Sequence, residues 1–244
     1  MTLPLLVGVL GSRIVSKVAA TIGYGNRELD LYPTSSIEPI CDAGMLPVGV
    51  ATADSVSGLD WCDLVSALVV PHDARGRAGG SSVADDDRHP GLPIVIGALA
   101  RHLPVLAVGS GERLLTAALA HHDPSRDSAA EQRSRGPDHD DGPDLTELLG
   151  ASGDRHLPLL VGATKVPAGM RVAVSGPDGS VYAVAADSGP RGPALSVRWD
   201  PGSLPLGDRA REGPFRWLRD HASGPRPPEE PVRRELLSVR EEVQ

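Results

Sequence analysis

Short apolar runs alternate with longer segments of helical pattern along the first half of the chain. Four apolar runs predict strands, of which the first and the last are expected to be buried: Pro4–Leu10, Leu46–Ala51, Ala67–Pro71 and Val105–Val108. Uniformly apolar strands separated by helices are typical of a parallel sheet covered by helices on both faces. The pattern therefore predicts an α/β fold, a three-layer sandwich around a mostly parallel central sheet.

Helical segments lie between these strands. In the segment Ser35–Gly44, Ser35 and Glu38 have the spacing of a capping box, and Gly44 is placed to end the helix. Leu92–His102 predicts a second helix, which leads into the strand at Val105.

The second half of the chain has a different pattern. Residues 170–186 predict a β-hairpin that turns at Pro177–Gly179, and Ala194–Trp199 predicts a further strand. Gly213–Ala222 predicts a last helix with Phe215 and Leu218 directed inward. Residues 75–90 and 121–144 are polar and predict surface loops. One domain is thus expected over residues 1–222, followed by a flexible tail over 223–244.

Composition and charge narrow the class of protein. With 244 residues and 40% hydrophobic content, the chain is long enough for one sizeable core. A net charge of −8 argues against a nucleic-acid partner. The start of the chain lacks a signal-peptide pattern, and no apolar run is long enough to span a bilayer, so we expect a cytoplasmic protein with no membrane partner. The excess of Arg over Lys is typical of a high-GC bacterial genome.

The segment Leu103–Ala120 has the pattern of an active-site turn. The strand Val105–Val108 is followed by Gly109, Ser110 and Gly111, and then by a helix with leucines on one face. Such a strand-to-helix turn raises one side chain above the sheet and directs helix N–H groups at it. The most exposed position of this turn is predicted to be Gly109, which carries no side chain.

Several local patterns occur in a recognisable order over residues 3–222. They are Ala43–Val48, Val69–Pro71, Pro104–Leu106, Gly111 with Leu114 and Leu115, Gly169–Val172, Pro177–Gly179 and Val197–Pro201. Together they resemble the class I glutamine amidotransferase-like hydrolases, closest to the gamma-glutamyl-gamma-aminobutyrate hydrolase branch. That branch has the patterns AGG-x-P-V, D-G-L-x-L-P-G-G, P-V-L-G-I-C-R-G-x-Q-L-L-N, P-x-G-x-R-V, P-D-G-x-x-E-A and V-Q-W-H-P-E. The resemblance implies a flavodoxin-like sandwich.

The family's catalytic residues are absent at the matching positions. In the family a cysteine attacks the amide carbon, a histidine takes its proton and a glutamate orients the histidine. Here these positions fall on Gly109, Asp200 and Gly202. The P-G-G strand that supplies oxyanion N–H groups reads Pro71, His72 and Asp73, and the substrate-lining H-H-Q stretch falls on Leu159–Val161. The resemblance therefore implies a scaffold that has lost the cysteine mechanism.

Other residues of the turn offer an alternative chemistry. In the family frame, the backbone N–H of the residue at Ser110 faces the oxyanion. Its hydroxyl is a candidate nucleophile, weighed against a helix N-cap with Glu112 and Arg113 as solvated first-turn residues. His72 and Asp73 follow a central strand, where open α/β sheets bind ligands, and are weighed against a turn pair.

Metal and thiol chemistry is not indicated. His121, His122, Asp123 and His139 lie in a polar loop, where converging ligand geometry is not expected. Cys41 and Cys62 are isolated and are expected to be packed as small apolar residues. No metal and no cofactor is therefore predicted.

The favoured function is that of a pseudoenzyme, a degenerate homologue of gamma-glutamyl amide hydrolases that binds a small ligand or a partner enzyme. Ligand contacts are expected from His72, Asp73, Gly109, Ser110 and Gly111. The alternative is a hydrolase or lyase acting on an amide substrate through a rebuilt site that includes Ser110 and Asp200. A third reading is a structural subunit. The sequence leaves the oligomeric state open, a homo-oligomer included.

Overall fold

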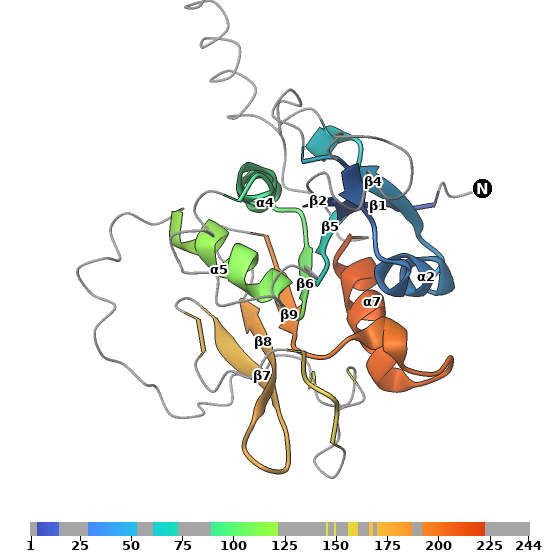
Figure 1. Cartoon of the computed structure of the whole chain (residues 1–244), viewed down its shortest axis with the longest axis vertical. Helices are drawn as coiled ribbons and strands as arrows, with labels where there is room; N and C mark the ends of the chain where they lie inside the picture. Colours follow the sequence, from blue (N-terminus) through green and yellow to red (C-terminus); the bar gives the residue numbers. More distant parts are fainter. Residues whose placement is uncertain are drawn as a thin grey trace, which may run out of the picture.

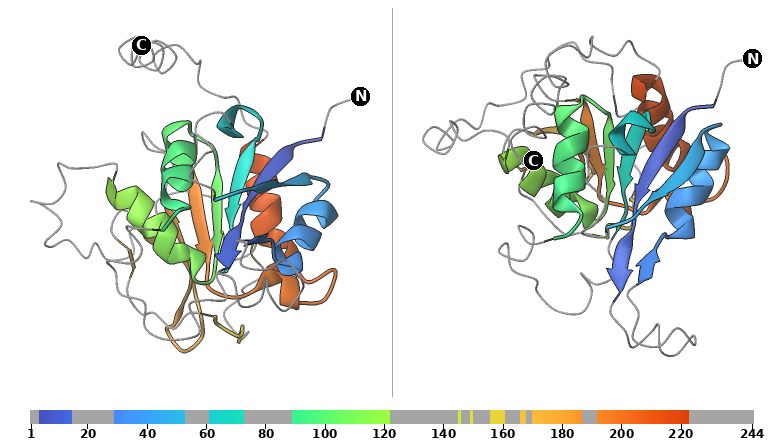
Figure 2. Two further views of the ribbon diagram at one scale, coloured as in Figure 1. Left: turned by 45° about the horizontal axis from the view of Figure 1, so that its top comes forward. Right: turned by 90° about the horizontal axis from the view of Figure 1, so that it is seen from above.

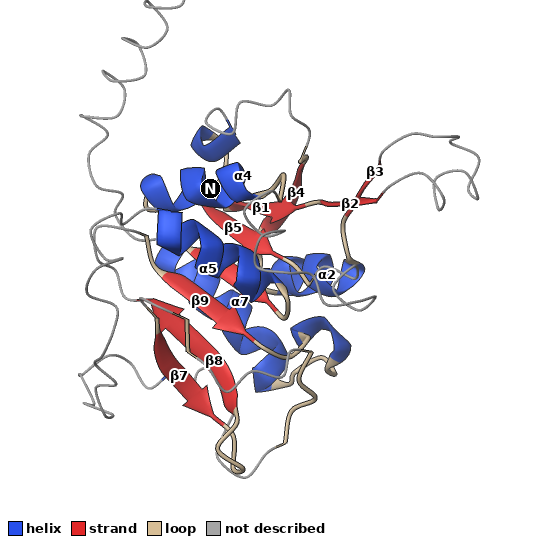
Figure 3. Cartoon of the chain, turned by 60° about the vertical axis from the view of Figure 1, so that its left-hand side comes forward, coloured by secondary structure: helices blue, strands red, loops and turns tan. Residues whose placement is uncertain are grey.

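The computed structural model of the chain describes residues 4–14, 29–52, 61–72, 89–121, 145, 149, 156–160, 166–167, 170–186 and 192–222. A seven-stranded sheet runs through its centre in the order β4-β1-β5-β6-β9-β8-β7. The strands are β1 Leu6–Leu10, β4 Leu46–Val50, β5 Ala67–Val70, β6 Val105–Val108, β7 Arg171–Ser175, β8 Val181–Ala186 and β9 Ala194–Val197. Neighbouring strands from β4 to β9 are parallel, and β8 and β7 add an antiparallel hairpin at one edge (Figure 3).

Helices cover both faces of the sheet (Figures 1 and 2). One face carries α2 (Thr34–Asp42) and α7 (Arg209–Ala222), and the other carries α4 (Leu92–Ala100) and α5 (Gly111–His121). Two short 3₁₀ helices, η1 (Trp61–Asp63) and η3 (Pro201–Ser203), and a separate two-stranded sheet of β2 (Ser12–Ile14) and β3 (Leu29–Leu31) complete the described elements. The expected α/β sandwich around a mostly parallel sheet is confirmed.

Alternation along the central strands divides the core into two halves. Val69 and Leu106 face α2 and α7, whereas Leu68, Val105 and Ala107 face α4 and α5. All five side chains are buried, because successive residues of a strand point to opposite faces and both faces are covered. This explains why β5 and β6 are apolar at every position.

The last helix is longer than the sequence pattern predicts. Phe215 and Leu218 are fully buried, as expected, but α7 begins at Arg209 instead of Gly213. The Asp208 carboxylate accepts a hydrogen bond from the backbone N–H of Ala210 at 2.9 Å. A carboxylate in this position stabilises a helix start, so the helix begins one turn before Pro214.

Two local predictions at α2 are wrong. The residue before the helix is Pro33 and no side chain caps it, so Ser35 and Glu38 do not form a capping box. Ser35 instead lies inside the helix and hydrogen-bonds Asp200. Cys41 is exposed, because it lies on the side of α2 away from the sheet, while Cys62 is buried as predicted. Burial raises the pKa of the Cys62 thiol to about 12, so it is not a nucleophile at neutral pH.

Candidate functional site

The residues of the candidate site follow three neighbouring parallel strands. His72 comes two residues after β5, Gly109 directly follows β6, and Asp200 comes three residues after β9. The carboxyl ends of adjacent parallel strands meet at one edge of the sheet, which is where open α/β folds place their ligands. The topology thus brings together residues that are more than 30 positions apart in sequence.

The chain turns sharply from β6 into α5 at Gly109, Ser110 and Gly111, and we call this turn the elbow. Gly109 has a φ of +53°, in the left-handed region that favours glycine, and its N–H donates to the Val197 carbonyl at 2.8 Å. A Cβ on Gly111 would lie 2.4 Å from the Val70 carbonyl oxygen. The helix therefore starts in contact with the end of β5, and Gly111 allows that approach.

His72 closes this turn from the neighbouring strand. Its Nδ1 accepts a hydrogen bond from the backbone N–H of Ser110 at 3.1 Å and lies 3.0 Å from the Ser110 Oγ. Because a backbone N–H can only donate, Nδ1 is an acceptor and the ring proton of a neutral His72 is on Nε2. Ser110, which directly precedes α5, offers its N–H and its hydroxyl to the same imidazole nitrogen.

The space beside Gly109 is filled. A Cβ at this position would lie 2.8 Å from both the His72 Nδ1 and the Leu160 Cδ1. Gly109 is itself buried, so the expectation that it is the exposed tip of the turn is wrong. His72, which follows β5, and Leu160 thus occupy the space into which a side chain at position 109 would project.

Asp200 is the third member of the group. Its Oδ1 accepts a hydrogen bond from the Gly202 N–H at 3.1 Å, which caps the 3₁₀ helix η3. Burial raises the pKa of the Asp200 carboxyl, although the Gly202 N–H, nearby His72 and the Ser35 hydroxyl each oppose this shift. The hydrogen bonds described for the Asp200 carboxyl are with the Gly202 backbone and with Ser35.

Gly202 is closely packed against α2. A Cβ on Gly202 would lie 2.0 Å from the Ser35 carbonyl oxygen. No longer side chain fits there without movement of one backbone segment. Position 202 is thus sealed by the contact between η3 and α2.

A buried ion pair lies directly after the elbow. Glu112 accepts hydrogen bonds from Arg198 Nε at 2.9 Å and Nη2 at 2.7 Å, and from the Ser196 hydroxyl at 3.1 Å. Arg198 is fully buried, and Glu112 is 8% exposed. The expectation that Glu112 is solvated is wrong, because Arg198 at the end of β9 approaches the first turn of α5 from inside.

Sequence reasoning did not single out Arg198. A charged residue between Val197 and Trp199, both fully buried, was the available signal, because a charge inside an apolar run requires a partner. Trp199 is a core residue as expected and donates from its indole nitrogen to the Ala210 carbonyl at 2.9 Å. The pair Glu112–Arg198 ties β9 to α5 and holds the elbow between them.

Several predicted site residues lie outside the described residues. They are Asp73, His122, Asp123 and His139, together with most of the two predicted loops and the tail from 223. Among the residues that the structure describes, no group of three His, Cys, Asp or Glu side chains is arranged to hold a metal ion. No helix in the described ranges has the length and apolar character needed to cross a membrane.

Comparison with models of known protein families gives no match, and no curated protein matches the sequence.

Proposed function

We propose that this chain is a catalytically inactive domain of the glutamine amidotransferase-like type, which acts by binding a partner and not by turnover. The proposal rests on the resemblance in sequence, with which the parallel sheet and the elbow between β6 and α5 are compatible. One observation supports the proposed loss of activity. The Ser110 N–H, which faces the oxyanion in the family frame, donates to His72 Nδ1 at 3.1 Å.

The position of His72 against the elbow interferes with two requirements of acyl transfer. A developing oxyanion needs preorganised N–H donors, and the imidazole of His72 already occupies the donor at Ser110. A nucleophile needs room at the tip of the elbow, and His72 and Leu160 fill that room. Substitution of Gly109 alone would therefore restore neither requirement.

The same geometry limits binding of a small ligand at the elbow. A carboxylate or amide oxygen could reach the Ser110 N–H only after His72 leaves it. We therefore favour a partner protein over a small molecule as what this domain binds, with the elbow as part of the supporting scaffold.

A second candidate function is a hydrolase that uses Ser110. The 3.0 Å contact between Ser110 Oγ and His72 Nδ1 favours it, since the hydroxyl could transfer its proton to Nδ1 while attacking an amide carbon. The imidazolium would pass this proton to the amine as the C–N bond breaks, and water would then hydrolyse the acyl-serine. The nearby charge of Asp200 would stabilise the protonated imidazole. Against it, the Ser110 N–H competes for the single lone pair of Nδ1.

Turnover assays on the purified chain test both functions. We expect no release of ammonia or glutamate from glutamine or gamma-glutamyl amides above background, and no labelling of Ser110 by an alkyl fluorophosphonate. Loss of a complete catalytic triad costs about 10⁶ in rate in the subtilisin example. Labelling or turnover that disappears in Ser110→Ala and His72→Ala, but persists in the control Ser203→Ala, would establish the serine hydrolase instead.

A thermal-shift screen tests the preference for a protein partner. Acetate, glutamate and glutamine should not raise the melting temperature of the wild-type chain by binding at Ser110, because the Ser110 N–H is occupied. A saturable rise that His72→Ala abolishes would show that the elbow binds a small ligand through His72 and would overturn the preference.

A further inference from the structure

One face of the edge strand β4 is apolar and exposed. Leu46 is 48% exposed and Val48 is 39% exposed. Alternate residues of a strand point to the same side, so both share the sheet face of Val50, which packs in the same half of the core as α4 and α5. Leu46 also pairs in register with Leu6 of β1, which is only partly buried. Apolar surface thus continues from β4 onto the start of β1.

No helix in the described part of the chain covers this face. On the same side of the sheet, α4 and α5 pack mainly over β5, β6 and β9. Between β4 and β5 the described helix is η1, and a Cβ on Gly8 in the middle of β1 would lie 3.4 Å from its Trp61 ring. Parallel sheets usually carry helices over both faces. The side of the sheet that carries α4 therefore lacks a helix at β4.

The open edge of β4 is unsuited to a further strand. The Leu46 N–H donates to the Leu5 carbonyl at 2.9 Å, on the side of β1, so the backbone of Pro47 faces the open edge. Proline carries no N–H and cannot donate to a ladder. We therefore expect the exposed side chains of β4 to be covered by a packed helix and not by an added strand.

The C-terminal segment has the pattern of such a helix. Within residues 223–244, which lie outside the described residues, apolar positions recur at intervals of four, three and four: Val232, Leu236, Val239 and Val243. This spacing places them on one stripe of a helix, with charged residues over most of the remaining surface. Pro231 precedes the stripe, as is common at the start of a helix. A helix of about 12 residues is marginal by itself in water, so it needs an apolar surface to pack on.

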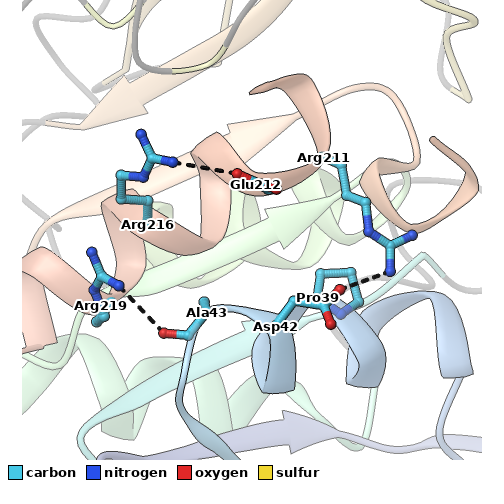
Figure 4. A pocket seen from close by; sticks show the side chains of 7 residues that line it. All are labelled: Pro39, Asp42, Ala43, Arg211, Glu212, Arg216 and Arg219. Carbon is cyan, nitrogen blue, oxygen red and sulfur yellow. Dashed lines mark hydrogen bonds and ion pairs between the residues drawn. The ribbon is translucent and has the colours of Figure 1, made fainter. Parts of the chain in front are cut away.

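α7 ends close to the start of β4. Buried Arg211 donates from Nη2 to Asp42 Oδ2 at 2.9 Å, which ties the first half of α7 to the end of α2. Near the other end of α7, Arg219 donates to the Ala43 carbonyl at 3.4 Å (Figure 4). Because Ala43 is three residues before Leu46, these contacts place the end of α7 at the amino-terminal end of β4.

The length of the chain after α7 allows it to reach the exposed face. Residues 223–231 span about 30 Å when extended, at about 3.3–3.6 Å per residue. This is enough to pass around the open edge of β4, to which no described strand is added. A helix over residues 232–243 is about 18 Å long, close to the length of a five-residue strand.

We propose that residues 232–243 form a helix whose apolar stripe packs on Leu46 and Val48 of the same molecule. Burial of apolar surface on both sides stabilises a helix that is too short to be stable alone. The helix completes the layer on this side of the sheet at β4. This face lies three strands away from the elbow at the end of β6, so the proposal does not rest on the proposed function.

Hydrogen exchange of backbone amides, followed by NMR on the full chain, tests the helix. Amides of residues 236–243 should exchange at least about tenfold more slowly than those of an unstructured chain. Leu236→Glu should abolish this protection, because it places a charge within the apolar stripe.

Leu237→Glu is the matched control. Successive residues of a helix are about 100° apart, so Leu237 lies outside the stripe formed by its neighbour Leu236. Leu and Glu have similar helix propensities, and protection should stay within about twofold of wild type. Equal loss of protection in both variants would mean that no stripe is packed and would overturn the proposal.

The double variant Leu46→Glu, Val48→Glu tests the face of β4. Both side chains are exposed, so the sheet should remain folded, as the amide of buried Leu106 in β6 would report. We expect the protection of residues 236–243 to be lost. Leu206→Glu is the control, because Leu206 is exposed in the connection between η3 and α7, and it should leave this protection unchanged. Protection that survives the double variant would mean that the segment packs elsewhere and would overturn the proposal.

A nitroxide at the end of the chain distinguishes the same molecule from a second copy. It is attached to Gln244→Cys in a Cys41→Ser background, because the Cys41 thiol is exposed. When the spin-labelled chain itself carries ¹⁵N, we expect broadening of the Leu46 and Val48 amide signals. Broadening that occurs instead in a ¹⁵N-labelled chain mixed with a spin-labelled chain would identify a second copy as the occupant and overturn the proposal. Absence of both protection and broadening would also overturn it.

Discussion

Two polar clusters meet at the start of α5, and they differ in how they are held. The contact between His72 and Ser110 is half-buried and involves neutral groups at 3.0–3.1 Å. The pair of Glu112, two residues after Ser110, and Arg198 is sealed in the core and joined by two hydrogen bonds. The protein should therefore stay folded when the contact between His72 and Ser110 is removed, whereas the ion pair behind it should be essential for the fold.

At this edge of the sheet, one cluster supports the scaffold and the other controls access to the elbow. The ion pair joins the end of β9 to the first turn of α5, so it sets where the elbow stands. The imidazole of His72 decides only whether the N–H of that elbow is available. A change at His72 can alter binding at the elbow without altering the scaffold.

The largest effect is expected from filling space beside this elbow. Gly202→Glu places a Cβ 2.0 Å from the Ser35 carbonyl oxygen, and Gly109→Cys places one 2.8 Å from His72 and Leu160. The triple variant Gly109→Cys, Asp200→His, Gly202→Glu should therefore lose more than about 4 kcal/mol of stability, an exceptional value for substitutions, and show no amidase activity.

Chemical denaturation of this triple variant and of each single variant measures the loss. Gly202→Glu alone should account for most of it, because its neighbour is backbone and not a flexible side chain. A folded triple variant that hydrolyses glutamine would show that the space is open and that only the catalytic residues are missing.

Breaking the ion pair is the next largest change. Glu112→Gln leaves the Arg198 charge buried without its counter-ion and should cost about 3–5 kcal/mol of unfolding free energy. Urea denaturation measures it. The exposed pair of Asp63 and Arg101 is the matched control, and Asp63→Asn should cost less than about 1 kcal/mol.

Replacement of both partners tests the cause of that loss. Glu112→Met with Arg198→Met removes both charges and should be less destabilising than Glu112→Gln, because no unpaired charge remains. An equal or larger loss would mean that the shape of the pair, and not its charge, holds β9 to α5.

Removal of the contact between His72 and Ser110 should have a smaller effect on the free energy of unfolding. His72→Ala removes the acceptor of the Ser110 N–H and should cost about 0.5–2 kcal/mol, the range for the loss of a helix cap. Ser110→Ala keeps the backbone contact and should cost less than His72→Ala. Thermal or urea unfolding measures both, and a loss at His72 as large as that of Glu112→Gln would contradict the distinction between the two clusters.

The smallest effect concerns Asp200 and depends on pH. Burial raises the pKa of its carboxyl above the unfolded value of about 3.9. The resulting stabilisation is complete below the unfolded pKa and is lost as the pH rises through the folded pKa. Asp200→Asn cannot ionise, so its stability relative to wild type should increase from pH 3.5 to pH 6.

The change for Asp200→Asn should remain below about 1 kcal/mol, because the side chain is only half buried and water screens its charge. Urea denaturation at several pH values gives the difference. A relative stability that falls with rising pH would mean that attraction to His72 outweighs burial.

The sequence pattern predicted most of the strands but little of the chemistry around the elbow. Apolar runs identified β1, β4, β5 and β6. In β1, β5 and β6 they reflect burial, because helices cover both faces of the sheet, whereas Leu46 and Val48 of the edge strand β4 are exposed. Hairpin residues at Pro177–Gly179 identified the antiparallel edge of β7 and β8. Both signals are local properties of the sequence, so they can be recognised without knowledge of the tertiary fold.

Contacts between residues that are distant in sequence explain why two predictions at the elbow were wrong. Glu112 has the sequence surroundings of a solvated first-turn residue, and only the approach of Arg198, 86 positions away, makes it a buried partner. Gly109 has the surroundings of an exposed tip, and its burial depends on His72 and Leu160 from two other segments. Sequence spacing contains no information on which distant side chain enters the same space.

The sequence by itself determined the layers of this protein, the glycine-rich turn between β6 and α5, and the absence of a cysteine at that turn. Each follows from periodicity or from the identity of one residue, which are local properties of the chain. Tertiary structure alone decided that His72 caps the Ser110 N–H, that Glu112 is paired in the core, and that Arg211 lies buried with an unsatisfied donor. These depend on the order of parallel strands and the packing of α2 on α7, which bring side chains distant in sequence within hydrogen-bonding reach.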